Sequence, residues 1–255
     1  MHIILLLLCG LFIGFIMLSL GMGAALYIGC FITVFHLVDK TAAATALVTT
    51  LPALIIGTFF YYRKHTINIH TGNKLLIWAL LGTFGGSLII PYINKKYYQV
   101  IISIILIVLS LTILYKFWVS PHIKRKHRIF TNHTDQIIAC FASVISGIMT
   151  GLAGMSGGGP LVAAMLLLNS PIATAAATSS YIRVWTTILG IGMHWDTMTI
   201  AWHPAIFMMI GTAVGAALSP IIMHKIDQTG KMRFTKFMKP LIALLLLFMG
   251  VKPFL

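Results

Sequence analysis

Long apolar segments, repeated along most of the chain, are the feature that most restricts how it can fold. Six of them contain about 17 to 23 residues each, the length that a helix needs to cross ~30 Å of hydrocarbon. Only 9% of the 255 residues are charged, whereas a soluble domain has about 25%. The sequence therefore predicts an all-α polytopic membrane protein. The six segments lie at about 41–62, 72–93, 97–119, 174–194, 201–223 and 234–250.

Two further apolar segments, 2–37 and 136–169, are too long for one straight helix across the membrane. The first contains Gly21-Met22-Gly23, and the second contains four glycines and a proline within 154–160. Glycine and proline both disfavour a continuous helix. We therefore expect each of these segments to be a broken helix.

An internal repeat relates the two halves of the chain. The block Thr41-Ala42-Ala43-Ala44-Thr45 recurs as Thr174-Ala175-Ala176-Ala177-Thr178, at an offset of 133 residues. The same offset, shortened by four residues near the end of the unit, aligns several glycines. The sequence predicts one unit used twice, a broken helix followed by three spans. The first transmembrane repeat is 1–119, a basic linker is 120–134, and the second transmembrane repeat is 135–255. The aligned pairs are Gly14/Gly147, Gly21/Gly154, Gly57/Gly190, Gly82/Gly211 and Gly86/Gly215.

The basic residues indicate how the two copies are oriented. If the broken segments cross the membrane, Lys and Arg outside the spans divide nine to eight between the two sides. If these segments return as re-entrant hairpins, thirteen lie on one side and only Lys40, Lys95, Lys96 and Lys252 on the other. The positive-inside rule favours the second arrangement. We therefore predict two inverted-topology repeats in the cell membrane, each a re-entrant hairpin plus three transmembrane helices, with both termini outside and the basic loops cytoplasmic.

The net charge of +14 comes from these short connectors, so we interpret it as a topology signal and expect no nucleic-acid partner. The three cysteines, Cys9, Cys30 and Cys140, lie in apolar segments without metal-ligand spacing. We expect them to be core residues, and we expect no metal and no cofactor.

Arg183 is the charged residue that the sequence places near the middle of a span. A central Arg costs ~2.5–3.5 kcal/mol on insertion scales, so intramembrane charges usually have a function. Its helical neighbours, one turn away on either side, are Ser179, Ser180, Thr186 and Thr187. No Asp or Glu lies deep within a predicted span. A cation among hydroxyl groups predicts an anionic ligand, and the alternative is that backbone carbonyls at the glycine breaks satisfy it.

The second glycine break could supply the other half of such a site. Ser156, Gly157, Gly158 and Gly159 would expose backbone N–H groups where the second half-helix begins, and a helix N-terminus favours anions. The alternative is that these glycines only let helices pack closely. The same two readings apply to Met22 and Gly23 in the first copy.

A different chemistry is also compatible with this segment. Gly154-Met155-Ser156-Gly157 fits the G-x-S-G pattern of intramembrane serine proteases, with His194 or His203 as a base. The first copy has Gly23 in place of Ser156, and a protease explains neither the duplication nor Arg183. We therefore expect a protein that is not an enzyme.

The glycine spacing of the second copy resembles that of the sulfite exporter TauE/SafE family. It runs Gly147-x3-Gly151-x2-Gly154-x2-Gly157-Gly158-Gly159, followed by Pro160 and by Thr174-x3-Thr178-Ser179, and the resemblance covers essentially the whole chain. The first copy departs from it with Gly21-Met22-Gly23-Ala24-Ala25. The resemblance implies export of sulfite or of organosulfonates such as sulfoacetate, with the hairpin glycines and Thr178-Ser179 lining the path.

These inferences together predict a membrane transporter that moves small sulfur-containing anions by alternating access, one repeat rocking against the other. An anion channel, or a carrier of another oxyanion or a carboxylate, is the alternative. The partners are the small anion and the lipid bilayer, and a homo-oligomer is compatible with this reading. The predicted substrate-binding residues are Arg183, Ser156, Gly157, Gly158, Gly159, Thr178, Ser179, Met22, Gly23 and Thr45.

Overall fold

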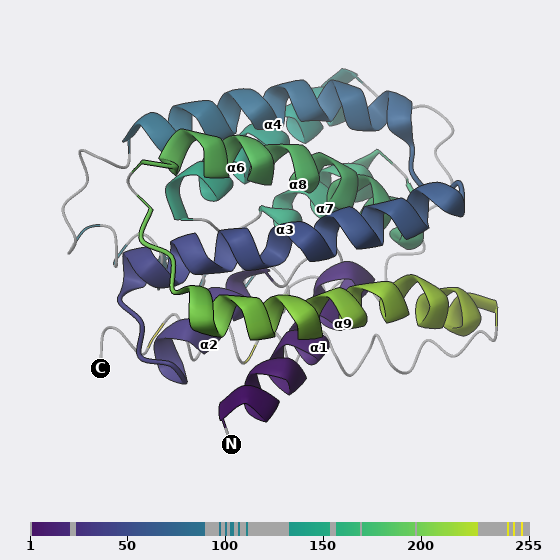
Figure 1. Cartoon of the computed structure of the whole chain (residues 1–255). Helices are drawn as coiled ribbons and strands as arrows, with labels where there is room; N and C mark the ends of the chain where they lie inside the picture. Colours follow the sequence, from purple (N-terminus) through teal and green to yellow (C-terminus); the bar gives the residue numbers. More distant parts are fainter. Residues whose placement is uncertain are drawn as a thin grey trace. The chain divides into compact units, whose positions relative to one another are not determined.

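The computed structural model describes residues 2–20, 24–89, 133–153, 157–168, 170–196 and 198–228, with a few isolated helical positions elsewhere. These ranges form eight helices and contain no strand. The predicted spans 97–119 and 234–250 lie outside them. The helices, labelled in Figure 1, are α1 (His2–Leu20), α2 (Ala24–Thr33), α3 (Asp39–Arg63), α4 (Ile69–Ile89), α6 (His133–Ala153), α7 (Gly158–Leu167), α8 (Ile172–His194) and α9 (Trp202–Gln228).

The chain divides into two compact units, Met1–Pro91 with Phe130–Met223, and Tyr92–Ile129 with His224–Leu255. Every contact described below lies within the first unit. The described helices of this unit follow the same order in the two halves of the chain. Adding 133 to the first residues of α3 and α4, Asp39 and Ile69, gives Ile172 and Trp202, the first residues of α8 and α9.

Each long apolar segment contains two described helices, and the predicted glycine breaks lie largely outside the described ranges, with Gly157 described as non-helical. The helix before the first break ends at Leu20 and the next begins at Ala24, while α6 ends at Ala153 and α7 begins at Gly158. Each second arm, α2 or α7, has only 10 residues. At 1.5 Å per residue, such an arm spans about half of the hydrocarbon core.

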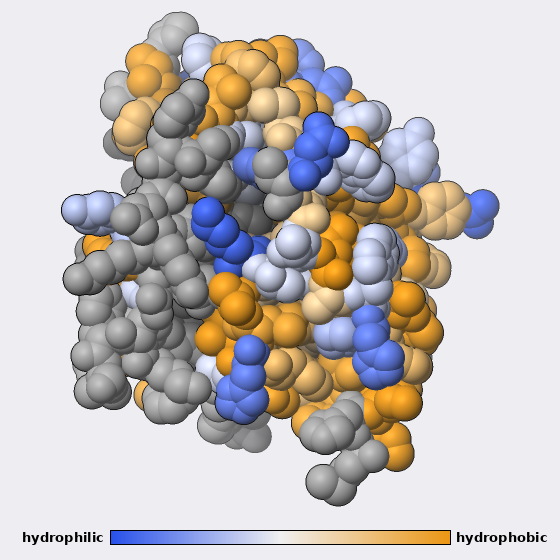
Figure 2. Space-filling view, turned by 60° about the vertical axis from the view of Figure 1, so that its left-hand side comes forward, coloured by the Kyte–Doolittle hydropathy of each residue, from blue (hydrophilic) through white to orange (hydrophobic). Residues whose placement is uncertain are grey.

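The distribution of polarity is the reverse of that in a water-soluble protein. Hydroxyl-bearing side chains of α3, α4, α8 and α9 are buried, whereas large apolar side chains are exposed one turn apart. Figure 2 shows apolar residues over much of one face. Within the described ranges, residues 40–63 and 202–219 form helices long and apolar enough to cross a membrane. Such an apolar surface is suited to contact with lipid. The exposed rows include Ile77, Leu81, Phe84 and Leu88 of α4, and Ile206, Ile210, Val214 and Leu218 of α9.

The closest helix contacts join the two copies. Helices α4 and α6 approach so closely that a Cβ atom added at Gly147 would collide with the carbonyl oxygen of Ala79, and one at Gly82 with that of Val144. A Cβ at Gly86 would lie 2.8 Å from the carbonyl oxygen of Ile148. Small residues permit this kind of approach between membrane helices.

The same contacts recur between α1 and α9. A Cβ at Gly211 or Gly215 would collide with the backbone carbonyl of Leu7 or Leu11, and one at Gly14 would lie 2.9 Å from Cα of Thr212. Gly14 and Gly147 are repeat mates, as are Leu11 and Val144. The first helix of each copy therefore packs on the last described helix of the other copy.

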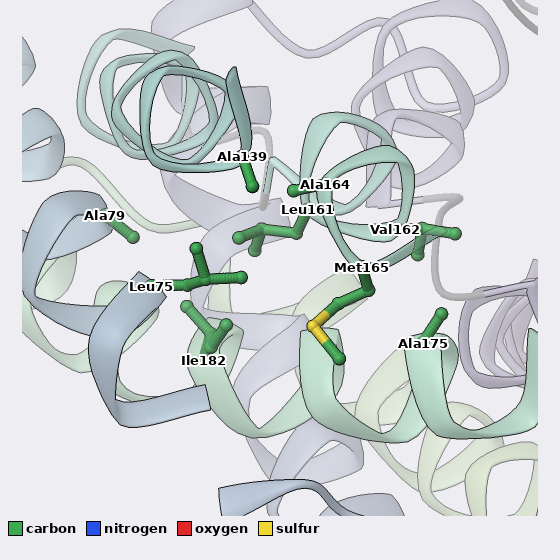
Figure 3. Close-up of a cluster of buried hydrophobic side chains, with 9 residues drawn as sticks. All are labelled: Leu75, Ala79, Ala139, Leu161, Val162, Ala164, Met165, Ala175 and Ile182. Atoms are coloured by element: carbon green, nitrogen blue, oxygen red, sulfur yellow. The ribbon is translucent and has the colours of Figure 1, made fainter. Parts of the chain in front are cut away.

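This exchange sorts the helices into two groups that do not coincide with the two copies. The first group is α1, α2, α3 and α9, and the second group is α4, α6, α7 and α8. An apolar core joins all four helices of the second group, with Leu75, Leu161 and Ile182 directed toward one another in Figure 3. The two groups meet where α3 packs against α8. That contact is called the seam below, and Arg183 lies on α8, one of the two helices that form it. The core residues are Leu75, Ala79, Ala139, Leu161, Val162, Ala164, Met165, Ala175 and Ile182.

Candidate anion-binding site

Arg183 lies in α8 and is completely buried, the largest side chain in the described ranges to be so. The four neighbours predicted to form a polar stripe with it, Ser179, Ser180, Thr186 and Thr187, are at most 1% exposed. Burying a charge is costly unless the surroundings are polar. A stripe of hydroxyl groups around the guanidinium meets that requirement.

Three of these hydroxyls donate to the backbone of their own helix. Ser179 Oγ and Ser180 Oγ both donate to the carbonyl oxygen of Ala176, at 2.9 and 2.8 Å, and Thr186 Oγ1 donates to that of Arg183 at 3.3 Å. With their protons engaged, these groups present oxygen lone pairs to their surroundings. Ser179 would have to rotate to donate to an anion.

Thr187 is different. Its Oγ1 is buried and makes no hydrogen bond within the part of the chain that the structure describes. A buried hydroxyl in that state costs about 1–3 kcal/mol. Since Thr187 lies one turn from Arg183 along α8, a donor in need of an acceptor stands beside a buried positive charge.

Thr45 and Thr178, two further predicted site residues, have equivalent roles in the two copies. Thr178 Oγ1 accepts a hydrogen bond from the backbone N–H of Asn68 at 3.0 Å, and Thr45 Oγ1 accepts one from that of Ala201 at 3.1 Å. Asn68 and Ala201 are again 133 residues apart. These bonds fix the segments that precede α4 and α9, and they leave each hydroxyl proton chemically able to reach an acceptor.

The glycine break of the second copy is described from Gly157 onward. The carbonyl oxygen of Gly157 accepts a hydrogen bond from Ser146 Oγ at 2.6 Å, and a Cβ at Gly157 would collide with Ser146. Gly158 and Gly159 open α7, so their N–H groups have no partner within that helix. Ser156, Met22 and Gly23 lie outside the described ranges.

Tyr27 of α2 is a buried polar residue that the sequence did not single out. It is completely buried, and its hydroxyl donates to Thr212 Oγ1 of α9 at 3.1 Å. This bond joins the second arm of the first copy to α9 of the second copy. Comparing the two copies could have drawn attention to Tyr27. The residue 133 positions later is Pro160, which has no polar side chain, so the copies differ at this position.

Comparison with known proteins identifies the family of this chain. A family model described as "Sulfite exporter TauE/SafE" matches residues 6–252. The chain belongs to the sulfite exporter TauE/SafE family. It is 23% identical over 271 residues to the "Probable membrane transporter protein YunE" of Bacillus subtilis (strain 168), with 98% of this chain and 99% of that protein covered. No solved structure matches. The recognition made from the glycine spacing is confirmed.

In this TauE/SafE protein, equivalent hydrogen bonds in the two copies join the end of α3 to α1 and the end of α8 to α6. Tyr61, near the end of α3, donates to the carbonyl oxygen of Leu18 at 2.8 Å. His194, at the end of α8, is the repeat mate of Tyr61, and its Nε2 lies 3.0 Å from the carbonyl oxygen of Gly151, the mate of Leu18. Because a carbonyl only accepts, this nitrogen carries the proton. Both bonds reach carbonyls in the last turn of α1 or α6.

These bonds bear on the serine protease alternative, whose nucleophile Ser156 lies outside the described ranges. Nε2 of His194 is engaged with a backbone carbonyl. His203 is exposed at the start of α9, where its ring packs edge-on against Phe207 at 5.2 Å. Within the described ranges, no three metal-ligating side chains cluster, and the cysteines Cys9, Cys30 and Cys140 are free thiols.

Proposed function

We propose that this TauE/SafE protein exports small sulfur-containing anions, sulfite or organosulfonates such as sulfoacetate, and that Arg183 binds the sulfo group. The observation that carries the proposal is a completely buried guanidinium one helical turn from Thr187, whose buried hydroxyl has no hydrogen-bond partner among the described residues. Together they form a positive site with a further hydrogen-bond donor. An anion with several oxygen atoms can accept hydrogen bonds from both groups at once.

The chemistry of the guanidinium favours an oxyanion. Its planar, forked N–H groups can donate to two oxygens of one sulfonate, which a spherical ion cannot accept in the same way. The third oxygen remains for hydroxyl donors such as Thr187. Burial strengthens these interactions, since the effective dielectric constant is lower than in water.

Burial also favours a carrier over a channel. The side chains of Arg183, Thr178 and Ser179 are all inaccessible from outside the protein in this conformation. An anion can reach them only after the helices move, which is what alternating access requires. A channel needs a path that remains open to both sides.

In this mechanism the two helix groups, and not the two copies, move relative to each other. Rocking one copy against the other would separate α4 from α6 and α1 from α9, whose backbones are in contact at glycines. Movement along the seam between α3 and α8 leaves those contacts intact. Such movement displaces α8, the helix that carries Arg183, and so changes access to the site.

The reciprocal contacts support the inverted-repeat arrangement proposed from charge placement. In a two-fold related pair, a contact from residue i of one copy to residue j of the other occurs in both directions. The pairs Gly82 with Val144 and Gly215 with Leu11 follow this rule at the constant offset of 133 residues, without the four-residue shift expected from the sequence. With both termini outside, outward movement of a monoanion is favoured by ~2.3 kcal/mol per 100 mV of inside-negative potential.

Transport by the purified protein in lipid vesicles tests the proposal. Sulfoacetate flux should saturate with concentration and should be lost in Arg183→Gln. Flux that rises without saturation would indicate the channel alternative. Competition by sulfite, methanesulfonate, acetate and oxalate ranks the oxyanions, and a stronger effect of the carboxylates would favour the alternative substrate class.

A further inference from the structure

Ser87 is a buried hydroxyl of α4 that the anion site described above does not include. It is 3% exposed, and its Oγ makes no hydrogen bond within the part of the chain that the structure describes. Three other buried hydroxyls of α4 and α6, those of Thr83, Ser143 and Thr150, donate to the carbonyl oxygen four residues earlier, at 2.9, 2.9 and 3.0 Å. A helical serine can form the same bond. Ser87 therefore keeps a buried donor that its own helix could have used, at a cost to stability.

Printed contacts place Ser87 beside the end of α8. Its Oγ would lie 3.0 Å from a Cβ added at Gly151 of α6. The carbonyl oxygen of the same glycine accepts the hydrogen bond from Nε2 of His194, the last residue of α8, at 3.0 Å. Ser87 and the end of α8 therefore meet at one residue of α6.

The other unbonded hydroxyl, that of Thr187, lies on the same side of α8 but nearer to Arg183. Thr187 and Gly190 follow Arg183 by four and seven residues, so all three share one face of the helix. A Cβ added at Gly190 would lie 3.9 Å from Cγ2 of Thr83, the residue one turn before Ser87 on α4. Along α8, Gly190 therefore stands between the two buried donors.

The layer around Gly190 is made of side-chain ends, not of backbone. The three atoms nearest to an added Cβ there are methyl carbons at ordinary contact distances, Leu47 Cδ2, Thr150 Cγ2 and Thr83 Cγ2, at 3.5, 3.8 and 3.9 Å. Leu47 lies on α3, in the first helix group, whereas Gly190 lies in the second. Movement along the seam would displace Leu47 and open this layer while the glycine contacts between α4 and α6 stay intact.

We propose that Ser87 is a second substrate-contacting residue, which donates its hydroxyl proton to the anion after the anion has left Arg183 and passed Gly190. This inference rests on the proposed function. In the topology proposed above, α4 and α8 both end at the outer face, so Ser87 lies on the exit side. Hydrogen bonds to charged acceptors are roughly twice as strong as those between neutral groups. The Ser87 hydroxyl would offset part of the cost of moving the anion away from the guanidinium.

Replacement of Ser87 separates this role from a structural one. Ser87→Ala removes a hydroxyl without a partner, so the midpoint of thermal unfolding should stay equal or rise. The saturated rate of sulfoacetate export from lipid vesicles should fall about tenfold, since a charge-assisted hydrogen bond on the path is lost. Calorimetric affinity should change less than twofold, because the anion at Arg183 lies on the other side of Gly190. Ser143→Ala, at a buried serine that donates within α6, is the control and should transport normally.

Chemical labelling tests the side on which Ser87 lies. In a background without native cysteines, Ser87→Cys should react with sulfonatoethyl methanethiosulfonate, a membrane-impermeant anion, when the reagent is added outside the vesicle in the exporting orientation. Sulfoacetate should slow this reaction by competing for the same path. Faster labelling from the inside, or no labelling from the outside, would overturn the proposal.

The outcomes distinguish this inference from the proposed function. If Ser87→Ala exports sulfoacetate at the wild-type rate, or loses rate, affinity and stability together, the role given to Ser87 is wrong. Should Ser87→Ala fail to fold, the labelling of Ser87→Cys decides. If the wild type does not transport sulfoacetate, or if Arg183→Gln transports it normally, the proposed function itself is wrong.

Discussion

At the scale of single residues, the buried hydroxyls of α8 differ in whether they donate a hydrogen bond to a backbone carbonyl. Ser179, Ser180 and Thr186 donate to backbone carbonyls, whereas Thr187 makes no such bond. A group that is buried without a partner weakens the fold, and such groups cluster where function requires them. Thr187 is therefore the hydroxyl on α8 that we expect to contact the substrate.

Replacing Thr187 tests this distinction. Thr187→Val keeps the shape and removes the hydroxyl, so sulfoacetate affinity should fall about tenfold, while stability should stay equal or rise by about 1 kcal/mol. Calorimetry and thermal unfolding measure the two effects. Thr58 Oγ1 in α3 is also buried without a partner, so Thr58→Val is a matched control with unchanged affinity. Equal affinity in the two variants would contradict a role for Thr187.

The sequence was informative about Arg183 and uninformative about Tyr27. An arginine in the middle of an apolar segment stands out because its burial is costly. A tyrosine in an apolar arm resembles an ordinary core residue, and only its hydrogen bond to Thr212 shows otherwise. The roles of Thr45 and Thr178 in holding the segments before α9 and α4 were also hidden, since the repeat identifies equivalent residues but not their partners.

At the scale of helices, glycine determines which pairs come into backbone contact. Gly82 and Gly86 of α4 face Gly147 and Gly151 of α6, and Gly10 and Gly14 of α1 face Gly211 and Gly215 of α9. The helix bounds followed from apolar length and glycine breaks. The sequence could not predict which helices pack against each other, because a small residue indicates a close approach but not which helix approaches.

A single methyl group should disrupt this packing. Gly147→Ala places a Cβ against the carbonyl oxygen of Ala79, so α4 and α6 must separate, at a cost of about 1–3 kcal/mol. We expect a lower midpoint of thermal unfolding in detergent. Gly85 lies on α4 and nothing comes within 4 Å of an added Cβ, so Gly85→Ala should leave the midpoint unchanged or raise it. Similar midpoints for the two variants would argue against the packing described.

At the scale of the whole molecule, the exchange of helices leads us to expect that the two helix groups, and not the two copies, move during transport. Each group contains three helices of one copy and one of the other, so the copies are units of sequence but not of packing. Sequence comparison could find the duplication and could predict an inverted second copy from charge. It could not find the exchange, because the contacts between α4 and α6 and between α1 and α9 leave no trace in hydrophobic periodicity.

Cross-linking can distinguish movement of groups from movement of copies. The hydroxyls of Thr41 in α3 and Thr199 in the segment just before α9 are 3.0 Å apart, so a bond between them joins the two copies beside the first group and not across the seam. Leu47 and Gly190, with Leu47 Cδ2 3.5 Å from an added Cβ, join the copies across the seam. In a background without native cysteines, a cross-link between cysteines at 47 and 190 should stop sulfoacetate transport, and one at 41 and 199 should not. Loss of transport in both would support rocking of the copies.

The central claim is that Arg183 binds a sulfur oxyanion, and the affinity of purified variants for sulfoacetate tests it most directly. Arg183→Gln removes the charge, and Arg183→Lys keeps the charge but loses the forked geometry. Calorimetry should show no measurable binding by the Gln variant and binding weakened at least tenfold in the Lys variant, with both variants folded by thermal unfolding. Wild-type affinity in Arg183→Gln would contradict the account.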